Sequence, residues 1–336
     1  MAEPSGVLPC QTIEALAAAG AIAASTPLAS GQVQPASLDL RLAARCWRVR
    51  ASFLPGPGRT VADRLKAVAM HELDLEGGEV LERGCVYIAE LQERLALPPE
   101  VTARGNPKSS TGRLDIFVRL LTDGGGSFED VSAGYQGPLY LEIAPQTFSV
   151  LARAGTRLNQ LRLRRGSPSR TSVSTVGVDL TGQIAGFRAR RHAPVIDLDR
   201  EESHDPRDFF EALEPRRGEL LLDPGEFYIL ASKQAVEIPL DQAAEMSPID
   251  TAVGEFRAHY AGFFDPGFGT PETESAGARG VLEVRSHETP FLLEDGQTVA
   301  RLVFEPLTER PTRLYGEDGS HYQRQGLKLS KHFKAW

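Results

Sequence analysis

The sequence lacks the long apolar runs and the excess of basic residues that mark several protein classes. Its 336 residues include no run of 18 apolar residues, so no membrane-spanning helix is predicted. Its net charge of −8 argues against a basic surface for nucleic acid, but it permits a local basic pocket for a polyphosphate. We therefore expect a protein that acts on neither membranes nor nucleic acids.

Cysteine is also scarce, with three widely spaced residues at Cys10, Cys46 and Cys85. An odd, scattered set argues against a disulfide framework, and it supplies no Cys-x-x-Cys pair for zinc. The start of the sequence, Met-Ala-Glu-Pro-Ser, lacks the basic and apolar stretches of a secretory signal, so a cytoplasmic protein is predicted. Neither a Gly-x-Gly-x-x-Gly motif nor a Walker-type loop occurs, which argues against dinucleotide binding and ordinary NTPase chemistry.

What the chain does contain is an internal repeat. Leu81–Ala89 aligns with Leu222–Leu230 at an offset of 141 positions, and the same offset relates Leu141-Glu142 to Leu282-Glu283. Chance would not hold one register through separated landmarks. The repeat therefore indicates two homologous domains in one chain.

We place the first domain at residues 1–170 and the second at residues 171–336. In both halves, glycine and proline punctuate short segments that are apolar or alternate between apolar and polar residues. Many short strands favour a mainly β fold, with a compact barrel or sandwich in each half and few short helices. The expected strands include residues 86–89, 114–118, 139–143 and 158–163, and the expected helices are residues 12–24 and 206–214.

The densest group of polar residues lies in the segment Asn106–Arg113. Two cations, three hydroxyls and a glycine fall within eight residues, and such groups together suit a phosphate chain. A solvated turn is the alternative interpretation. The aligned segment Ile249–Gly254 lacks the serines and cations, which indicates that the two halves differ in function.

A glutamate stands at the same strand position in each half, as Glu142 and Glu283, and each interrupts an apolar run. A lone glutamate of this kind is most often a strand residue facing water or part of a structural ion pair, but its recurrence favours a function. A third segment, Tyr315–Gly326, is polar, aromatic and rich in glycine. It suits either a frayed terminus or a lid that orders over a ligand.

Taken together, these motifs resemble the dUTPase / dCTP deaminase superfamily. Gln34–Arg41 is similar to its N-terminal motif, and Lys108–Arg113 is similar to its phosphate-binding Arg/Lys-Ser-Ser-x-x-Arg motif. Two further segments resemble the dCTP deaminase branch: Gly134–Glu142, in which Gly-x-x-Gly is followed by Leu-Glu, and the tail Tyr322–Ser330. The motifs cover nearly the whole chain as two copies, as in the longer two-domain bacterial members.

The resemblance implies tandem dUTPase-like β-barrel domains in a trimer-based homo-oligomer, with sites between neighbouring domains. It also implies deamination of dCTP to dUTP and ammonia without zinc, with a glutamate as the general base on water. The residues agree on zinc independently, because zinc deaminases need His-x-Glu and Pro-Cys-x-x-Cys, and neither motif is present. Mg²⁺ is expected to arrive with the triphosphate.

Carried over residue by residue, the resemblance makes Glu142 or Glu283 the base. Ser109 and Arg113 would position the water and hold the carboxylate. Neither half alone carries the full set of motifs, and His321 stands where the family usually has lysine. The expected nucleotide contacts are Lys108, Ser110, Thr111, Gly112, Asp265, Tyr315, His321 and Gln325.

A symmetric ring of three domains cannot alternate first and second halves, because three is odd. Two stacked rings would follow, and the ring of first halves would hold Ser109, Arg113 and Glu142. Glu142 is therefore the predicted base, and Glu283 is the second choice. The alternatives are a bifunctional dCTP deaminase/dUTP diphosphatase, a dUTPase, and a non-enzymatic nucleotide-binding protein.

Overall fold

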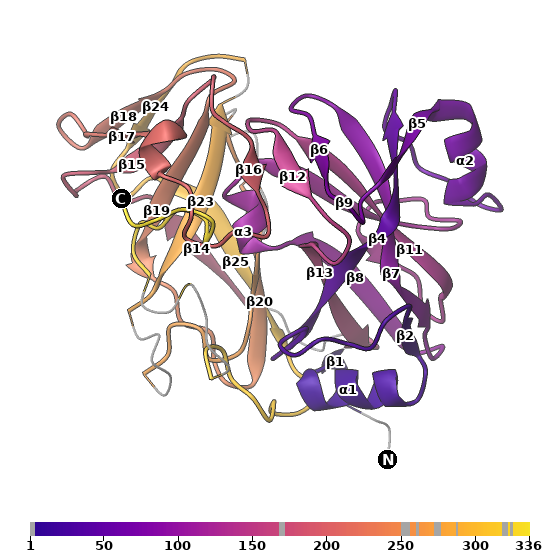
Figure 1. The fold of residues 1–336 in the computed structure, drawn as a ribbon. Helices are drawn as coiled ribbons and strands as arrows, with labels where there is room; N and C mark the ends of the chain where they lie inside the picture. Colours follow the sequence, from indigo (N-terminus) through magenta and orange to yellow (C-terminus); the bar gives the residue numbers. More distant parts are fainter. Residues whose placement is uncertain are drawn as a thin grey trace.

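The computed structural model describes residues 4–167, 172–249, 256–259, 262–271, 277–286, 288–317, 322 and 325–336. Strands dominate the element order, and the predicted mainly β fold is confirmed. The first half of the chain, drawn in indigo to magenta, and the second half, drawn in orange to yellow, lie side by side (Figure 1).

The first half is built around one large, mainly antiparallel sheet. Its elements are β1 (Gly6–Val7), α1 (Cys10–Ala18), β2 (Ile22–Ala24), β3 (Val33–Gln34), β4 (Ser37–Val49), α2 (Val61–Val68), β5 (Ala69–Asp74), β6 (Glu79–Leu81), β7 (Val86–Ala96), β8 (Val101–Pro107), α3 (Ser109–Gly112), β9 (Ile116–Thr122), β10 (Asp130–Val131), β11 (Gln136–Pro145), β12 (Val150–Ala152) and β13 (Arg157–Arg165). The sheet runs in the order β10-β8-β13-β4-β7-β11-β9, with β1, β2, β3 and β5 pairing at its sides.

The second half is divided among smaller sheets. Its elements are β14 (Ser172–Gly177), β15 (Gly186–Ala189), β16 (Ile196–Asp197), η1 (Pro206–Asp208), β17 (Phe210–Leu213), β18 (Glu219–Leu222), β19 (Phe227–Ala235), β20 (Gln242–Pro248), β21 (Phe256–His259), β22 (Phe263–Phe264), β23 (Arg279–Ser286), β24 (Phe291–Glu294) and β25 (Thr298–Pro306). Two of the sheets run in the orders β14-β25-β20-β22 and β17-β15-β19-β23-β21, and β18 pairs with β24. Strand β16 instead pairs in parallel with β12, so the start of the second half returns to the first.

The strand pairing repeats the offset found in the sequence. Glu142 of β11 pairs with Ile88 of β7, and Glu283 of β23 pairs with Ile229 of β19. Both members of the second pair lie 141 positions after those of the first. The two glutamates therefore occupy equivalent places in equivalent sheets.

The border between the halves is polar as well as apolar. Arg162 of β13 is completely buried, and it donates from Nη1 to the carbonyl oxygen of Ala244 at 2.9 Å and from Nη2 to that of Phe264 at 3.1 Å. Nearby, Arg164 forms a two-armed ion pair with Glu305 at 2.5 and 2.7 Å. Charged, two-armed contacts of this kind fix geometry as well as adding energy. They hold the two sheets in one orientation.

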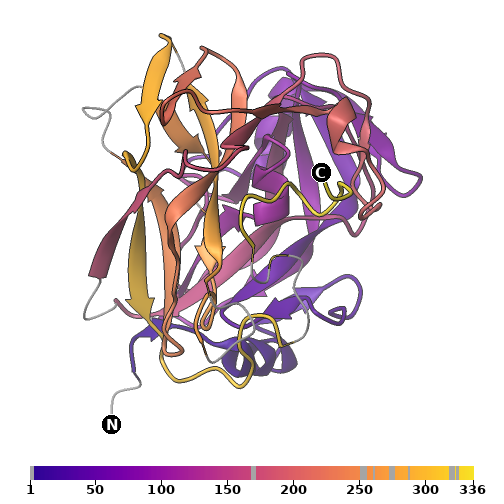
Figure 2. The same cartoon turned by 90° about the vertical axis from the view of Figure 1, so that its left-hand side faces the viewer.

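The C-terminal tail packs back onto the first half. Phe333 contacts Phe209 edge-on, with ring centroids 5.1 Å apart, and Phe209 in turn contacts Phe148 at 5.6 Å. Burial of an aromatic side chain stabilises a fold by about 1.5–3 kcal/mol. Figure 2 shows the yellow tail running beside the magenta helix α3. Sequence-distant segments are thereby held next to the 106–113 segment.

Both predicted helices end earlier than expected. The helix predicted at 12–24 ends at Ala18, because Gly20 takes a positive φ of 79° and residues 22–24 then pair with β7 as β2. The segment 206–214 is a single 3₁₀ turn followed by β17, and the strand predicted at 114–118 begins at Ile116. The other three predicted strands lie within β7, β11 and β13.

Helix α2 was not predicted, although the sequence carries its start. Thr60 accepts a hydrogen bond from the amide of Asp63 at 3.0 Å, and the Asp63 side chain reaches back to the Thr60 amide. This is a capping box, in which two unpaired amides at a helix start are satisfied reciprocally. In the part of the chain that the structure describes, no helix has the length and apolar character needed to cross a membrane.

Candidate functional site

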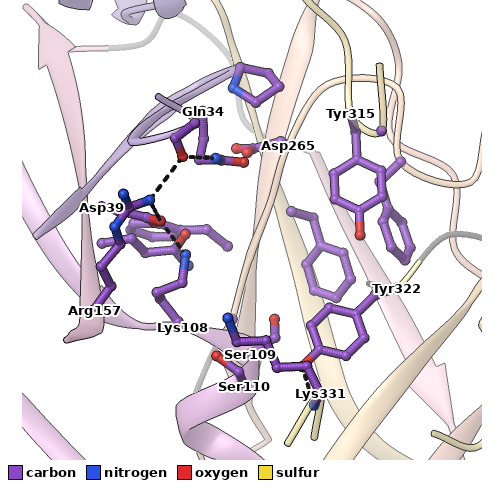
Figure 3. A pocket seen from close by; sticks show the side chains of 18 of the residues that line it. Gln34, Asp39, Lys108, Ser109, Ser110, Arg157, Asp265, Tyr315, Tyr322 and Lys331 are labelled. Carbon is purple, nitrogen blue, oxygen red and sulfur yellow. Dashed lines mark hydrogen bonds and ion pairs between the residues drawn. The ribbon is translucent and has the colours of Figure 1, made fainter. Parts of the chain in front are cut away.

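A cavity of about 420 Å³ lies where the two halves meet. Figure 3 shows labelled side chains from both halves and from the C-terminal segment around it. Its size suits a ligand larger than a single sugar or base. Its polar lining includes Asp39, Lys108, Ser109, Ser110, Arg113, Arg157, Asp265, Glu283, Tyr315, Tyr322, Gln325 and Lys331.

The 106–113 segment enters the cavity as a tight turn between strands. β8 ends at Pro107, and the amide of Lys108 then donates to the carbonyl oxygen of Leu158 at 3.0 Å. The hydroxyl of Thr111 donates to the same carbonyl at 2.9 Å, so this side chain fastens the turn to β13. Ser109 points toward the second half, where its Oγ lies 3.8 Å from the place that a Cβ on Gly262 would occupy.

One end of the cavity gathers cations and carboxylates. Lys108 Nζ donates to Asp39 Oδ2 at 2.5 Å, and Arg157 lies 3.6 Å from the same oxygen. From the second half, Asp265 pairs with the buried Arg162 at 3.4 Å. Burial raises the pKa of Asp265, Arg162 opposes that shift, and the charge of Asp39 adds to it. Two cations beside two buried carboxylates suit a ligand that carries both phosphates and donor hydroxyls.

Aromatic side chains line another wall. Phe268 contacts Phe264 at a centroid distance of 5.1 Å and Tyr315 at 5.0 Å, both edge-on. The backbone fixes this group, because the amide of Tyr315 donates to the carbonyl oxygen of Pro266 at 2.9 Å. An aromatic wall next to a polar end favours a ligand with a flat ring at one end and charge at the other.

Arg113 connects the first half to the tail and to Glu283. Its Nη2 donates to Gln325 Oε1 at 2.9 Å, its Nη1 donates to the carbonyl oxygen of Lys328 at 3.1 Å, and its Cζ lies 3.9 Å from the ring centroid of Tyr322. Its Nε lies 3.9 Å from Glu283 Oε1 and has no hydrogen-bond partner within the described part of the chain. That separation is too long for a direct hydrogen bond and is the kind that a bridging water spans.

Glu283 is 5% exposed at its place on β23. Burial raises the pKa of its carboxyl to about 8; Arg113 acts in the opposite direction, and the charge of Asp115 adds to the rise. A carboxyl with a pKa near neutrality is suited to accept a proton and return it. The site thus combines a buried acid/base group with an arginine that favours its ionised form.

The tail is tied to the same turn. Gln325 holds Arg113 with its oxygen and donates from Nε2 to the carbonyl oxygen of Arg279 at 2.8 Å. Further along, the hydroxyl of Ser330 donates to the carbonyl oxygen of Ser110 at 2.8 Å. The tail is therefore fastened to the turn at both residues, and Gln325 also lines the cavity.

Most of the predicted site residues come together. Lys108, Ser109, Ser110, Arg113, Asp265, Glu283, Tyr315 and Gln325 line the cavity. Thr111 faces the backbone of β13 instead, and neither it nor Gly112 lines the cavity. The prediction for His321 concerns a residue outside those that the structure describes.

Within one chain, Glu142 does not lie with Ser109 and Arg113, and its role as the base stays a prediction. Its carboxylate accepts from Arg119 Nε at 2.9 Å, and Arg119 is in turn covered by the ring of Phe128 at 3.5 Å. Glu142 is buried, with 1% of its surface exposed, and it does not line the cavity. The structure therefore brings the serine and arginine of the first half to the glutamate of the second half, and not to their own.

Sequence reasoning missed Asp39, Arg157 and Lys331 as lining residues. Asp39 had a usable signal, since a carboxylate between Leu38 and Leu40 interrupts a buried strand. Arg157 and Lys331 had none, because each is brought in by pairing and packing far along the chain. Among the described residues, no group of three or more histidine, cysteine, aspartate or glutamate side chains is arranged to hold a metal ion.

Comparison with known proteins gives a consistent result. The family model of the 2′-deoxycytidine 5′-triphosphate deaminase N-terminal domain matches residues 4–167, and that of the C-terminal domain matches residues 161–333. A crystal structure of 2′-deoxycytidine 5′-triphosphate deaminase from Agrobacterium tumefaciens is 50% identical and superposes with a TM-score of 0.87, covering 90% of this chain and 99% of that one.

Curated relatives match over a shorter stretch. A dCTP deaminase of Halorubrum lacusprofundi is 33% identical over 132 residues, which are 39% of this chain and 62% of the relative. A protein of Halobacterium salinarum named "dCTP deaminase, dUMP-forming" is 31% identical over 157 residues, 45% of this chain and 75% of the relative. The chain thus covers about two thirds of the length of these relatives.

Proposed function

Because the chain belongs to the family of 2′-deoxycytidine 5′-triphosphate deaminases, we propose that it converts dCTP and water into dUTP and ammonia in the cavity between its halves. The observation that carries the proposal is the meeting of Ser109 and Arg113 with Glu283, beside the cations of one end and the aromatic wall of the other. The product would feed pyrimidine deoxynucleotide synthesis.

In the proposed reaction, Glu283 is the general base. A water between its carboxylate and Arg113 Nε, which are 3.9 Å apart, loses a proton to Glu283 and adds to C4 of the cytosine ring. Glu283 passes this proton to N3 of the ring, then takes the proton of the new C4 hydroxyl and gives it to the amino group, so the tetrahedral intermediate collapses to uracil and ammonia. Ser109 orients the water, and Arg113 favours the carboxylate form of the base.

The rest of the cavity suits the rest of the nucleotide. Lys108, Ser110 and Asp265 line the cavity. Lys108 and Ser110 would hold the triphosphate, which would arrive as a magnesium complex, and Asp265 would contact the sugar hydroxyl. The ring would lie against the aromatic wall made by Phe264, Phe268 and Tyr315.

Zinc has no part in the proposed mechanism. The support is the absence of His-x-Glu and Pro-Cys-x-x-Cys from the sequence, because zinc deaminases draw their ligands from those motifs. Turnover should survive treatment with a zinc-selective chelator once magnesium is restored. A stoichiometric zinc whose removal abolishes turnover would overturn this part of the proposal.

The direct test is incubation of the purified chain with magnesium and dCTP, dUTP or dTTP, followed by separation of the nucleotides and an ammonia assay. Release of ammonia and dUTP from dCTP alone supports the proposal. No turnover, with binding only, would favour a nucleotide-binding protein.

A second activity has one observation in its favour, namely that the Halobacterium salinarum relative is named as dUMP-forming. If this chain also cleaves the triphosphate, dCTP and two waters would give dUMP, ammonia and pyrophosphate, and the same separation would show dUMP. We also retain a cytoplasmic location and a trimer-based homo-oligomer as proposals. Cell fractionation tests the first, and sedimentation of the purified protein tests the second.

A further inference from the structure

An ion pair at the border of the halves lies just outside the cavity. Asp115 of the first half is 1% exposed, and Arg285 of β23 donates to its Oδ2. Thr147 completes the group, since its hydroxyl donates to Asp115 Oδ2 at 2.5 Å and accepts from Arg285 Nη2 at 3.1 Å. None of the three lines the cavity, so none is placed to contact a nucleotide there.

The backbone at Asp115 holds it between the turn and the sheet. Its amide donates to the carbonyl oxygen of Gly112 at 2.9 Å, and its own carbonyl accepts from the amide of Gln146 at 2.9 Å. The residue has a φ of 54°, in the left-handed region that favours glycine. A side chain at such a position costs about 1 kcal/mol, although aspartate tolerates it better than most residues. Glycine would fit this backbone without strain, so what aspartate adds at the position is its carboxylate.

The position of Arg285 explains why its partner matters. Residues two apart on a strand point to the same face, so Arg285 projects on the same side of β23 as Glu283. An unrestrained guanidinium there could pair with the Glu283 carboxylate. Asp115 holds one arm of Arg285, and the carbonyl oxygen of Gly225 accepts from the other.

We propose that Asp115 is a positioning residue for Glu283, which fixes β23 against the Ser109–Arg113 turn and keeps the Arg285 guanidinium from pairing with the base. The proposal rests on the deaminase function proposed above. Asp115 acts through Arg285 and the strand, not on the substrate.

The electrostatics agree with this geometry. Within the described residues, the charges that act on Glu283 are those of Arg113 and Asp115, and Arg285 lies two positions further along the same strand. Across the sheet, Ile229 of β19 is apolar, and His259 of β21 stands opposite in the register. Burial first, and then the charge of Asp115, raise the pKa of Glu283, whereas Arg113 lowers it.

The test uses two variants of the full-length protein, Asp115→Asn and Asp115→Gly. The first keeps the shape of the side chain without its charge, and the second places the residue best suited to a φ of 54° at that position, so folding is not at risk from backbone strain. With dCTP as substrate, both should lower kcat about 10-fold and leave KM within about twofold. The rising limb of kcat/KM against pH should move to lower pH by roughly one unit, because a negative charge near the base is lost.

The matched control is Glu305→Gln, which removes a carboxylate from another ion pair between the halves, that of Arg164 and Glu305. It should lower the melting temperature without moving kcat or the pH profile.

Failure of the wild-type protein to release ammonia from dCTP would overturn the proposed function itself. If the wild type is active but both Asp115 variants keep its kcat and pH profile, the positioning role is wrong. It is equally wrong if Glu305→Gln lowers kcat as much as they do.

Discussion

Glu142 and Glu283 stand at equivalent positions of equivalent strands, yet their carboxylates meet different partners. Glu142 is held by Arg119 from the neighbouring strand of its own sheet, at 2.9 Å. Glu283 has Arg113 at 3.9 Å, from a turn of the other half, and the space beside it is open to the cavity. The same residue on the same scaffold is therefore a structural ion pair in one copy and a candidate base in the other. Position on the strand does not assign the role; the group that approaches the carboxylate does.

The strongest test of the proposed difference between Glu142 and Glu283 is to change each one to glutamine. Glu283→Gln keeps the size of the side chain and removes the base, so kcat for dCTP should fall by about 10³-fold while dCTP still binds. Glu142→Gln should leave kcat within about twofold and cost about 1 kcal/mol of the free energy of unfolding, because the ion pair becomes a hydrogen bond from the Arg119 cation to a neutral amide oxygen.

Steady-state kinetics and thermal unfolding of both variants would decide between them. The opposite ranking of the two kcat values would return the role of base to Glu142. The site would then have to form between chains and not within one.

The two arginines that approach these glutamates should differ in the same sense. Arg113→Ala removes the group that favours the carboxylate form of Glu283 and holds Gln325, and kcat should fall by about 10²-fold. Ser109→Ala should act similarly, whereas Lys108→Ala should mainly raise KM, because its proposed contact is with the phosphates.

Arg119→Ala is the matched variant in the first half. It should cost about 3 kcal/mol of stability by leaving the buried Glu142 without its partner, and the kcat of the folded protein should stay near that of the wild type. Equal kinetic losses in the Arg113 and Arg119 variants would mean that the distinction between the two environments has no catalytic meaning.

The sequence indicated which residues belong to the candidate site, but not how they meet within the chain. The Lys108–Arg113 motif and the glutamates are short, contiguous patterns, so they can be recognised without a fold. Which glutamate meets Arg113 depends on how the two halves pack, and that packing is set by contacts such as Arg162 with Ala244, which are 82 positions apart. The ring argument concerned contacts between chains and stays a prediction, whereas the cavity described here joins unlike halves within one chain.

The strands were predictable for a similar reason. Alternation and turn residues are local, and three of the four proposed strands lie within β7, β11 and β13. The fourth was placed too early because Asp115 has a φ of 54°, which interrupts the strand. No local sequence pattern predicts this conformation, and the partner of Asp115, Arg285, lies 170 positions away.

The pH dependence of kcat/KM provides a third test, for which we expect an effect of intermediate size. The pKa of Glu283 is raised to about 8 from an ordinary value of 4.5, mainly by burial, and a base must be ionised to act. kcat/KM should therefore rise with pH and level off above about 8. A flat profile between pH 6 and 9 would argue against Glu283 as the base.

Stability should change in the opposite direction over the same window. A carboxyl whose pKa is raised on folding binds more protons in the native state, so its contribution is full below about pH 4.5 and is lost as the pH rises through about 8. Unfolding of the wild type should become easier over this range, and Glu283→Gln should flatten the trend. Glu129, whose pKa burial raises to about 7, would leave a smaller residual slope in that variant.

The smallest expected effect concerns the tail. Ser330 donates to the carbonyl oxygen of Ser110 at 2.8 Å, which ties the C-terminal segment to the turn that should hold the phosphates. Ser330→Ala removes a buried hydrogen bond worth about 1 kcal/mol, so KM for dCTP should rise about 3–5-fold with little change in kcat. The matched variant is Ser52→Ala, because Ser52 accepts from Arg119 beside Glu142 and should affect neither constant. If both serines prove silent, the other contacts of the tail, such as Gln325 with Arg113 and Phe333 with Phe209, suffice to hold it. If Ser52→Ala raises KM as much as Ser330→Ala does, the first-half glutamate region communicates with the site, and the two environments are less separate than their geometry indicates.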